Sequence, residues 1–397
     1  MNDASLRARR AVQDLRASKI REVANAAIGR TDVIAFWFGE SDEVTPEFIR
    51  QAGMDAIAAG ETFYTHNLGL IELRESIAAY VSRLHRAVGA EHIAVTNSGM
   101  SALMLATQAL VGTGDRVVVV TPVWPNLVEI PKILGAHVST VPLRFSTRGW
   151  TLDLDQLLDA LTPGTRAVYV NSPNNPTGWT ITADAQRTLL EHCRRHGIWI
   201  LADDAYERLV YPVQESNHAT APSFLKIAHE EDRLVSTNTF SKSWLMTGWR
   251  LGWIVVPPEL IPALATLIEY NTSCAPGFVQ RAGIAAIEHG EPVIARTLER
   301  FRGARNFLLT ELGKISGIEV ASPVGAMYAF FRVEGMSDSL RYCKQLVQEA
   351  GLGLAPGIAF GPEGEGFIRW CFAAEQARLA EGIARLKRGL SRIARAS

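Results

Sequence analysis

Short apolar runs alternate with longer segments of helical periodicity from about residue 47 to 290. Several of the runs are apolar throughout, which is typical of strands that helices cover on both faces. This alternation predicts a mainly parallel β-sheet with helices on both sides, and hence an α/β fold. The predicted strands span residues 93–96, 116–120, 166–170, 198–202, 234–237 and 251–256.

The pattern changes after about residue 295, where a long helical stretch leads into further strand-like runs. This change predicts a smaller α+β domain, which the N-terminal segment completes. We therefore expect a large domain at 47–295 and a small domain made of 1–46 and 296–397. In the small domain, helical patterns lie at 295–315, 337–350 and 375–393, and strand-like runs lie at 327–333, 353–354 and 367–372.

The segment 5–28 is basic and helical in pattern. The acidic side chains of Asp3, Asp14 and Glu22 count against a transit peptide, because such peptides are poor in acids. We expect a helix that packs on the body of the protein or on a partner subunit.

Composition narrows the class of protein. The chain has 397 residues, 47% of them hydrophobic, which is enough for two domains with a large core. Its net charge of −1 gives no electrostatic case for nucleic acid or acidic membranes. No apolar run approaches the length of a bilayer span, so we expect a soluble protein. Four scattered cysteines without a CxxC motif suit reduced thiols in a cytoplasmic enzyme: Cys193, Cys274, Cys343 and Cys371.

Polar residues gather just after the predicted strands, at 97–99, 171–178, 203 and 239–242. Ligands of open α/β sheets bind beyond the carboxyl ends of the strands. We therefore expect these four clusters to meet in one crevice.

Lys242 lies between small hydroxyl residues and next to bulky apolar ones, and Arg250 follows eight residues later. A partly desolvated amine loses its proton more easily, and the neutral amine can attack a carbonyl to form a Schiff base. Hydroxyls and a guanidinium suit a phosphate. Carbonyl chemistry beside a phosphate site indicates pyridoxal phosphate. Taken alone, a lysine such as Lys242 is far more often a solvated side chain on a loop.

Asp203 ends an apolar run, where a carboxylate needs a cationic partner. A protonated pyridine nitrogen is one such partner, and it would keep the cofactor an electron sink. The alternative is that Asp203 caps a following helix. Tyr206 is placed to hydrogen-bond the phenolic oxygen of the cofactor, or is simply a half-buried tyrosine.

Three further positions have both a functional and a structural interpretation. Gly99, at a strand-to-helix turn, lets an anion approach free backbone N–H groups, or is only a turn residue. Asn175 lies in a segment dense in turn formers. The segment is either a surface turn or a loop that places Asn175 to donate to the same phenolic oxygen. Trp124 either stacks on a planar ring or belongs to the core.

Arg369 lies in the middle of an apolar strand, where a cation is costly unless it is paired. A substrate α-carboxylate is a natural bidentate partner, and a salt bridge to a buried acid is the alternative. His192 and His196 have the spacing of metal ligands on a helix. However, Gly197 is a predicted helix C-cap, so a structural role is favoured and no metal is expected.

The chain resembles class I/II aminotransferases of pyridoxal-phosphate fold type I over nearly its whole length. The motifs occur in the order of that family: Phe38-Gly39-Glu40-Ser41-Asp42, Tyr64 to Arg74, Ser98-Gly99, Asn174 to Gly178, Asp203-Asp204-Ala205-Tyr206, Ser241-Lys242, Met246 to Arg250, and Gly364 to Arg369.

The resemblance implies a seven-stranded-type sheet in the large domain and a role for each motif. Lys242 forms the Schiff base and moves the proton, Asp203 pairs with the pyridine nitrogen, and Tyr206 completes the catalytic set. Asn175 and Tyr206 flank the phenolic oxygen, and Trp124 stacks on the ring. The implied phosphate ligands are Gly99, Met100, Thr239, Ser241 and Arg250, with Tyr64 reaching in from the neighbouring subunit of a homodimer. Arg369, Gly39 and Asn175 bind the substrate.

The chain departs from the family pattern at two positions. Thr239 replaces the usual Ser or Gly but keeps a hydroxyl. Met100 stands where some aspartate-using relatives carry a lysine, so a dedicated dicarboxylate preference is in doubt. Trp37, Phe38 and Met100 would make that side of the pocket apolar.

These observations predict transfer of an amino group from an amino acid to a 2-oxo acid. A carbon–sulfur β-lyase, or another pyridoxal-phosphate enzyme on the same scaffold, shares every motif and stays an alternative. A non-catalytic binding or regulatory protein is a third hypothesis, against which Lys242 and Asp203 are both present.

Overall fold

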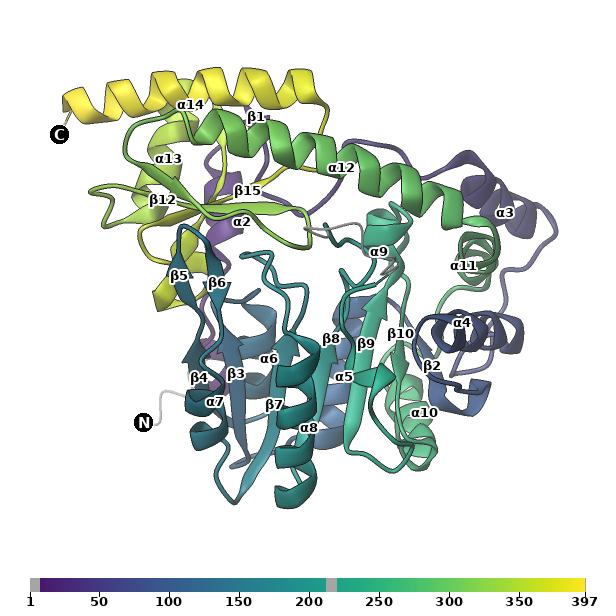
Figure 1. Cartoon of the computed structure of the whole chain (residues 1–397). Coiled ribbons are helices and arrows are strands. Elements are labelled where there is room, and N and C mark those ends of the chain that lie inside the picture. Colours follow the sequence, from purple (N-terminus) through teal and green to yellow (C-terminus); the bar gives the residue numbers. More distant parts are fainter. Residues whose placement is uncertain (1–7, 212–219, 397) are drawn as a thin grey trace, which may run out of the picture.

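A seven-stranded sheet forms the centre of the molecule in the computed structural model, which describes residues 8–211 and 220–396 (Figure 1). Its strands lie in the order β2 (Ile93–Thr96), β10 (Gly252–Val255), β9 (Leu234–Thr239), β8 (Trp199–Asp203), β7 (Thr165–Asn171), β3 (Arg116–Thr121) and β4 (His137–Pro142). β10 is antiparallel to both of its neighbours, β2 and β9, and the other adjacent pairs are parallel. The predicted mainly parallel sheet is confirmed, and all six predicted strands are present.

The sheet is apolar on both faces because helices cover both. Along β3, Val117 and Val119 join one hydrophobic cluster, whereas Val118 and Val120 join the other. This alternation arises because successive side chains of a strand point to opposite faces of the sheet, and each face packs against its own hydrophobic cluster. The helices that cover the sheet include α5 (Gly99–Leu110), α6 (Asn126–Ile133), α7 (Leu154–Ala160), α8 (Ala183–His196) and α10 (Ile261–Glu269). Three further helices pack together beside the β2 edge: α3 (Glu47–Ala58), α4 (Ile71–Leu84) and α11 (Gly277–His289).

A second, antiparallel sheet lies above the first (Figure 1). Its strands are β11 (Ile318–Val320), β12 (Tyr328–Val333), β15 (Phe367–Cys371) and β14 (Ala355–Pro356), in that order. The flanking helices are α12 (Glu291–Leu312), α13 (Ser339–Ala350) and α14 (Gln376–Ala396). These elements match the expected α+β pattern.

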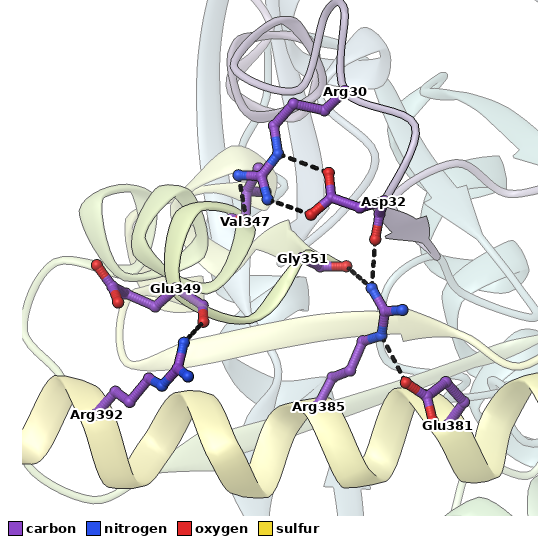
Figure 2. Close-up of polar contacts among 8 residues, drawn as sticks. All are labelled: Arg30, Asp32, Val347, Glu349, Gly351, Glu381, Arg385 and Arg392. Atoms are coloured by element: carbon purple, nitrogen blue, oxygen red, sulfur yellow. Dashed lines mark hydrogen bonds and ion pairs between the residues drawn. The ribbon is translucent and has the colours of Figure 1, made fainter.

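The N-terminal segment belongs with this second sheet. β1 (Ile34–Ala35) pairs in parallel with β13 (Leu352–Gly353). Figure 2 shows how the segment is anchored. Arg30 forms a bidentate ion pair with Asp32 and donates to the Val347 carbonyl at 2.9 Å. Arg385 donates to the Gly351 and Asp32 carbonyls. On this basis we propose a small domain of residues 1–46 and 296–397 and a large domain of residues 47–295.

One expectation for the N-terminus is wrong. The single helical stretch across 5–28 is two short helices, α1 (Arg10–Gln13) and α2 (Lys19–Asn25), and residues 1–7 lie outside the described part of the chain. The break follows from Ser18, whose Oγ accepts a hydrogen bond from the Arg21 N–H at 3.3 Å and so caps α2. None of the helices in residues 8–211 and 220–396 combines the length and apolar character of a membrane span.

Candidate active site

A cavity of about 240 Å³ lies at the carboxyl ends of the central strands, between the two sheets. Every site residue predicted from the sequence lines it, except Tyr64. The lining residues are Ile20, Trp37, Phe38, Gly39, Gly99, Met100, Leu103, Trp124, Asn171, Asn175, Asp203, Ala205, Tyr206, Thr239, Ser241, Lys242, Arg250, Tyr328 and Arg369. The expectation that the polar clusters meet in one crevice is confirmed.

Lys242 lies in α9 (Phe240–Ser243), the turn of helix that directly follows β9. Its Nζ reaches across the cavity and donates to the Gly39 carbonyl at 2.6 Å. Burial lowers the pKa of this amine to about 8. Lys242 is therefore not the solvated loop lysine of the alternative interpretation, and about a tenth of the amine is neutral at pH 7.

Asp203 ends β8 on the floor of the same cavity and is only 6% exposed. One carboxylate oxygen accepts a hydrogen bond from the Ala205 N–H at 3.3 Å. Burial raises the pKa of Asp203 to about 7, against the opposing effects of that hydrogen bond and of the Lys242 amine. Residues 205–208 form a turn, so Asp203 does not cap a helix there. A cationic ligand atom at this position would favour the ionised carboxylate.

An anion cradle forms where α5 begins. The helix starts at Gly99, and Ser98 Oγ caps it by accepting from the Ser101 N–H at 3.1 Å. A Cβ at Gly99 would lie 2.9 Å from the Cβ of Thr239, so glycine is what lets the helix approach β9 so closely. The positive end of α5 thereby faces the cavity, which suits a phosphate.

Two hydroxyls and a guanidinium complete this cradle. Thr239 Oγ1 accepts from the Ser241 N–H at 3.1 Å and lies 2.9 Å from Ser241 Oγ. Arg250 follows the short helix η3 (Thr247–Trp249) with φ at +57°, a backbone conformation that costs energy in a residue other than glycine. Strain of this kind gathers at functional sites, and here it brings a cation to the cradle.

Arg369 enters the cavity from β15 and is 2% exposed. Its Nη1 donates to Asn175 Oδ1 at 3.0 Å, its Nη2 donates to the Trp37 carbonyl, and its Nε is buried without a partner. The alternative of a structural salt bridge is wrong, because no acid within residues 8–211 and 220–396 pairs with Arg369. A buried guanidinium with a spare N–H is arranged for an added carboxylate.

Tyr328 is a lining residue that the sequence analysis missed. Its hydroxyl lies 2.6 Å from the hydroxyl of Tyr206. A Cβ at Gly39 would lie 2.0 Å from the same hydroxyl, so Gly39 is a glycine because Tyr328 fills that space. Tyr328 belongs to a predicted strand, and the requirement of a buried tyrosine hydroxyl for a partner is the signal that could have singled it out.

Three more of the predicted residues differ in how far they are buried. Asn175 lies in a segment, 171–178, that is buried throughout, so the surface-turn alternative is wrong. Trp124 is half-buried and lines the cavity. Tyr64 lies outside the cavity with 89% of its surface exposed.

The two histidines of α8 make contacts within the fold. The two rings lie 4.5 Å apart, and His192 Nε2 pairs with the Leu161 carbonyl at 3.1 Å. Gly197 ends the helix in the left-handed conformation, as predicted. No group of three potential metal ligands occurs among the described residues.

Comparison with known proteins gives the family. The family described as "Aminotransferase class I and II" matches residues 31–386. The chain belongs to the class I and II aminotransferases. It is 31% identical over 380 residues to an aspartate aminotransferase of Pyrococcus horikoshii, with 95% of each chain covered. It is 33% identical over 357 residues to one of Thermotoga maritima, covering 90% of this chain and 91% of that one. The crystal structure of a Thermotoga maritima aspartate aminotransferase superposes with a TM-score of 0.88 at 31% identity, covering 97% of this chain and all of that one.

This aminotransferase therefore has the predicted fold, enzyme class and cofactor, since the family depends on pyridoxal phosphate. The cavity fits that cofactor on its own features. A buried acid, Asp203, is available to a pyridine nitrogen, and the glycine start of α5 faces a phosphate. The substrates of the family are amino acids and 2-oxo acids, and the unpartnered Nε of Arg369 suits their carboxylate.

Proposed function

We propose that this aminotransferase works through Lys242 and Asp203, which hold the cofactor from two sides. The observation that carries the proposal is a buried amine with a pKa of about 8 in the same cavity as a buried aspartate. Bound pyridoxal phosphate supplies the aldehyde that accepts the amino group and a ring that withdraws electrons from the α-carbon of the substrate.

The protein side chains then divide the remaining work. Lys242 would hold the aldehyde carbon of the cofactor. As a free amine beside the α-carbon of the substrate, it would take the α-proton and return it to that former aldehyde carbon. Asp203 keeps the proton on the pyridine nitrogen. Asn175 and Tyr206 donate to the phenolic oxygen, and Trp124 covers one face of the ring.

The anionic ends of the ligands have separate partners. Gly99, Met100, Thr239, Ser241 and Arg250 hold the phosphate, the first two through backbone N–H groups. Arg369 binds the α-carboxylate of the substrate, with Asn175 and the wall at Gly39 beside it. Because Arg369 is already held by Asn175 and Trp37, a substrate carboxylate meets a guanidinium that needs no rearrangement.

An amino-transfer assay tests this proposal against the lyase alternative. The protein, loaded with pyridoxal phosphate, is incubated with a panel of amino acids and a 2-oxo acid, and the new amino acid is measured. Ammonia and pyruvate from cystathionine are measured in parallel. Transfer without ammonia release supports the proposal, whereas ammonia and pyruvate as the main products would replace it with a β-lyase.

The Tyr206–Tyr328 pair leads to a spectroscopic prediction. The two hydroxyls lie 2.6 Å apart, so a Tyr206 hydroxyl that donates to the phenolic oxygen would itself accept a hydrogen bond from Tyr328. That second bond would strengthen the bond to the phenolic oxygen and stabilise the negative charge on this oxygen. We expect Tyr328→Phe to raise the midpoint pH at which the absorbance of the bound cofactor titrates by about 0.5 to 1 unit, the equivalent of one hydrogen bond.

Tyr211→Phe is the matched control for this measurement. Tyr211 is also a buried tyrosine, but its hydroxyl donates to the Ala326 carbonyl at 2.7 Å, away from the cavity lining. The midpoint should stay unchanged in that variant. Equal midpoints in the Tyr328→Phe variant and the unmodified protein would rule out the relay.

We also propose a homodimer in which Tyr64 reaches the phosphate of the other subunit. Phe63, Tyr64 and Tyr270 are each at least 85% exposed, and a partner surface would cover them. The two loops that carry them are joined, because the Thr65 N–H donates to Cys274 Sγ at 3.4 Å.

Mixing two inactive variants tests the shared site. Lys242→Ala and Tyr64→Ala dimers are combined under conditions that exchange subunits. A mixed dimer has one site with both residues intact, so activity and tight cofactor binding should return. Sedimentation should give twice the mass of one chain. A monomer in sedimentation, or no recovery on mixing, would contradict the arrangement.

The state of the thiols supports a proposal for the compartment of the enzyme. Cys193, Cys343 and Cys371 are free and buried, and burial raises the pKa of each thiol, which keeps them unreactive. We propose that the enzyme works in the reducing cytoplasm.

A further inference from the structure

One part of the cavity lining is an apolar wall. We define this wall as Ile20, Trp37, Phe38, Met100 and Leu103, all of which line the cavity. The first three come from the N-terminal segment and the last two from α5. A substrate side chain that extends from the α-carbon toward this wall would leave water for an apolar surface.

The wall is held firmly in place. A Cβ at Gly353 would lie 2.1 Å from the indole of Trp37, so the glycine in β13 leaves room for that ring. Trp37 and Phe38 meet edge to face at 6.1 Å between centroids. Asn126 Nδ2 lies 2.9 Å from Met100 Sδ. The shape of the wall is therefore set before a substrate binds.

The cations of the cavity already have partners or roles. Within the described part of the chain, the cationic side chains of the lining are Lys242, Arg250 and Arg369. Lys242 donates to Gly39 and is proposed to carry the cofactor. Arg250 donates to the Thr247 carbonyl at 2.7 Å and faces the phosphate cradle.

Arg369 is similarly committed. Its guanidinium is stacked against the rings of Tyr328 and Phe360, at 4.5 and 4.9 Å from their centroids, and is proposed above to bind the α-carboxylate. Arg21 lies over Phe38 at 5.2 Å, but its side chain is exposed and is not part of the lining. A second carboxylate on the substrate would thus meet apolar surface, because the three lining cations of this chain are already assigned to the cofactor and the α-carboxylate.

From this arrangement we infer that the amino donor is a neutral amino acid with a large apolar side chain, aromatic or branched aliphatic, and not a dicarboxylic one. The inference rests on the proposed function, because it assumes that Arg369 binds the α-carboxylate. It sets this chain apart from the aspartate aminotransferases that it resembles. Burial of the apolar side chain favours binding, whereas burial of an unpaired carboxylate opposes it.

The half-reaction with each donor separates the two classes. Protein loaded with pyridoxal phosphate is mixed with one donor and no 2-oxo acid, and the absorbance change of the bound cofactor gives kcat/KM. We expect phenylalanine and leucine to exceed aspartate by about 100-fold or more, with alanine between them. Binding of unreactive acids is measured by calorimetry, and 3-phenylpropanoate should bind more tightly than succinate.

A charge placed on the wall should reverse the preference. We expect Met100→Lys to raise kcat/KM for aspartate by about 10-fold or more and to lower it for phenylalanine by a similar factor. Met104→Lys is the matched control, because Met104 lies one turn further along α5 and does not line the cavity. Its donor preference should equal that of the unmodified protein, and the cofactor absorbance shows that both variants fold.

The outcomes of these experiments test the donor preference separately from the proposed roles of the site residues. If aspartate reacts as fast as phenylalanine and leucine in the unmodified protein, or succinate binds as tightly as 3-phenylpropanoate, the apolar preference is wrong and the site assignment stands. If no donor changes the absorbance of the bound cofactor, the assignment of Lys242 is wrong and the preference falls with it.

Discussion

Replacing Lys242 with alanine should lower kcat for amino transfer by about 10⁴-fold or more. The variant loses both the amine that holds the aldehyde and the base that moves the α-proton, because the two roles belong to one nitrogen. Its bound cofactor should also lose the absorbance change with pH that the unmodified protein shows. Single-turnover kinetics with saturating donor measure the first effect, and a pH titration of the spectrum measures the second.

Lys226→Ala is the control for this prediction. Lys226 is exposed, lies in the short helix η2 (Phe224–Lys226) and does not line the cavity. Its removal should leave kcat and the spectrum unchanged. A Lys242→Ala protein that retains more than about a tenth of the original kcat would show that another group moves the proton.

Replacing Asp203 with asparagine should lower kcat by about 10²- to 10³-fold, in line with the loss of a preorganised electrostatic contact. Asparagine keeps the shape and the acceptor for the Ala205 N–H, but it carries no charge to hold a proton on the pyridine nitrogen. The ring then withdraws electrons less strongly, so removal of the α-proton becomes slow. We expect a larger kinetic isotope effect with α-deuterated donor, because that step then limits the rate.

The neighbouring residue provides the matched control. Asp204 is also buried, but its Oδ2 accepts from Ser236 Oγ at 2.7 Å and it does not line the cavity. Asp204→Asn makes the same chemical change one residue away. Its kcat and isotope effect should match those of the unmodified protein. Comparable losses in both aspartate variants would mean that Asp203 acts through general stability and not through the ring nitrogen.

The strands that could be predicted from the sequence are those that are buried on both faces of the sheet. β3 and β8 are buried on both faces, so an unbroken apolar run is their signature. β4 has no such run, because it lies at the sheet edge with His137, Ser139 and Thr140 exposed. Short pairs such as β5 (Arg144–Ser146) and β6 (Gly149–Thr151) also lack a run long enough to detect.

The direction of a strand leaves no trace in its periodicity. β10 was predicted as a strand, but its antiparallel course between β2 and β9 is visible only in the structure. Similarly, the break between α1 and α2 depends on the single hydroxyl of Ser18, which a basic and helical pattern conceals.

The site likewise contains residues that could be predicted from the sequence and residues that could not. Asp203 and Lys242 could be placed together from sequence because the carboxyl ends of neighbouring strands must meet. Tyr328 and Ile20 come from the second sheet and the N-terminal segment, and no local pattern brings them there. The hydroxyl pair of Tyr206 and Tyr328 joins positions 122 residues apart. Contacts of that kind follow from how the sheets pack, which periodicity does not report.

Chemical trapping of the cofactor on the chain tests the central claim most directly. The loaded protein is treated with borohydride and digested with trypsin, and the peptide that carries the added mass is sequenced by mass spectrometry. The expected peptide spans residues 234–250 with Lys242 modified and uncleaved. Added mass on another lysine, or on none, would contradict the assignment of Lys242 as the residue that holds pyridoxal phosphate.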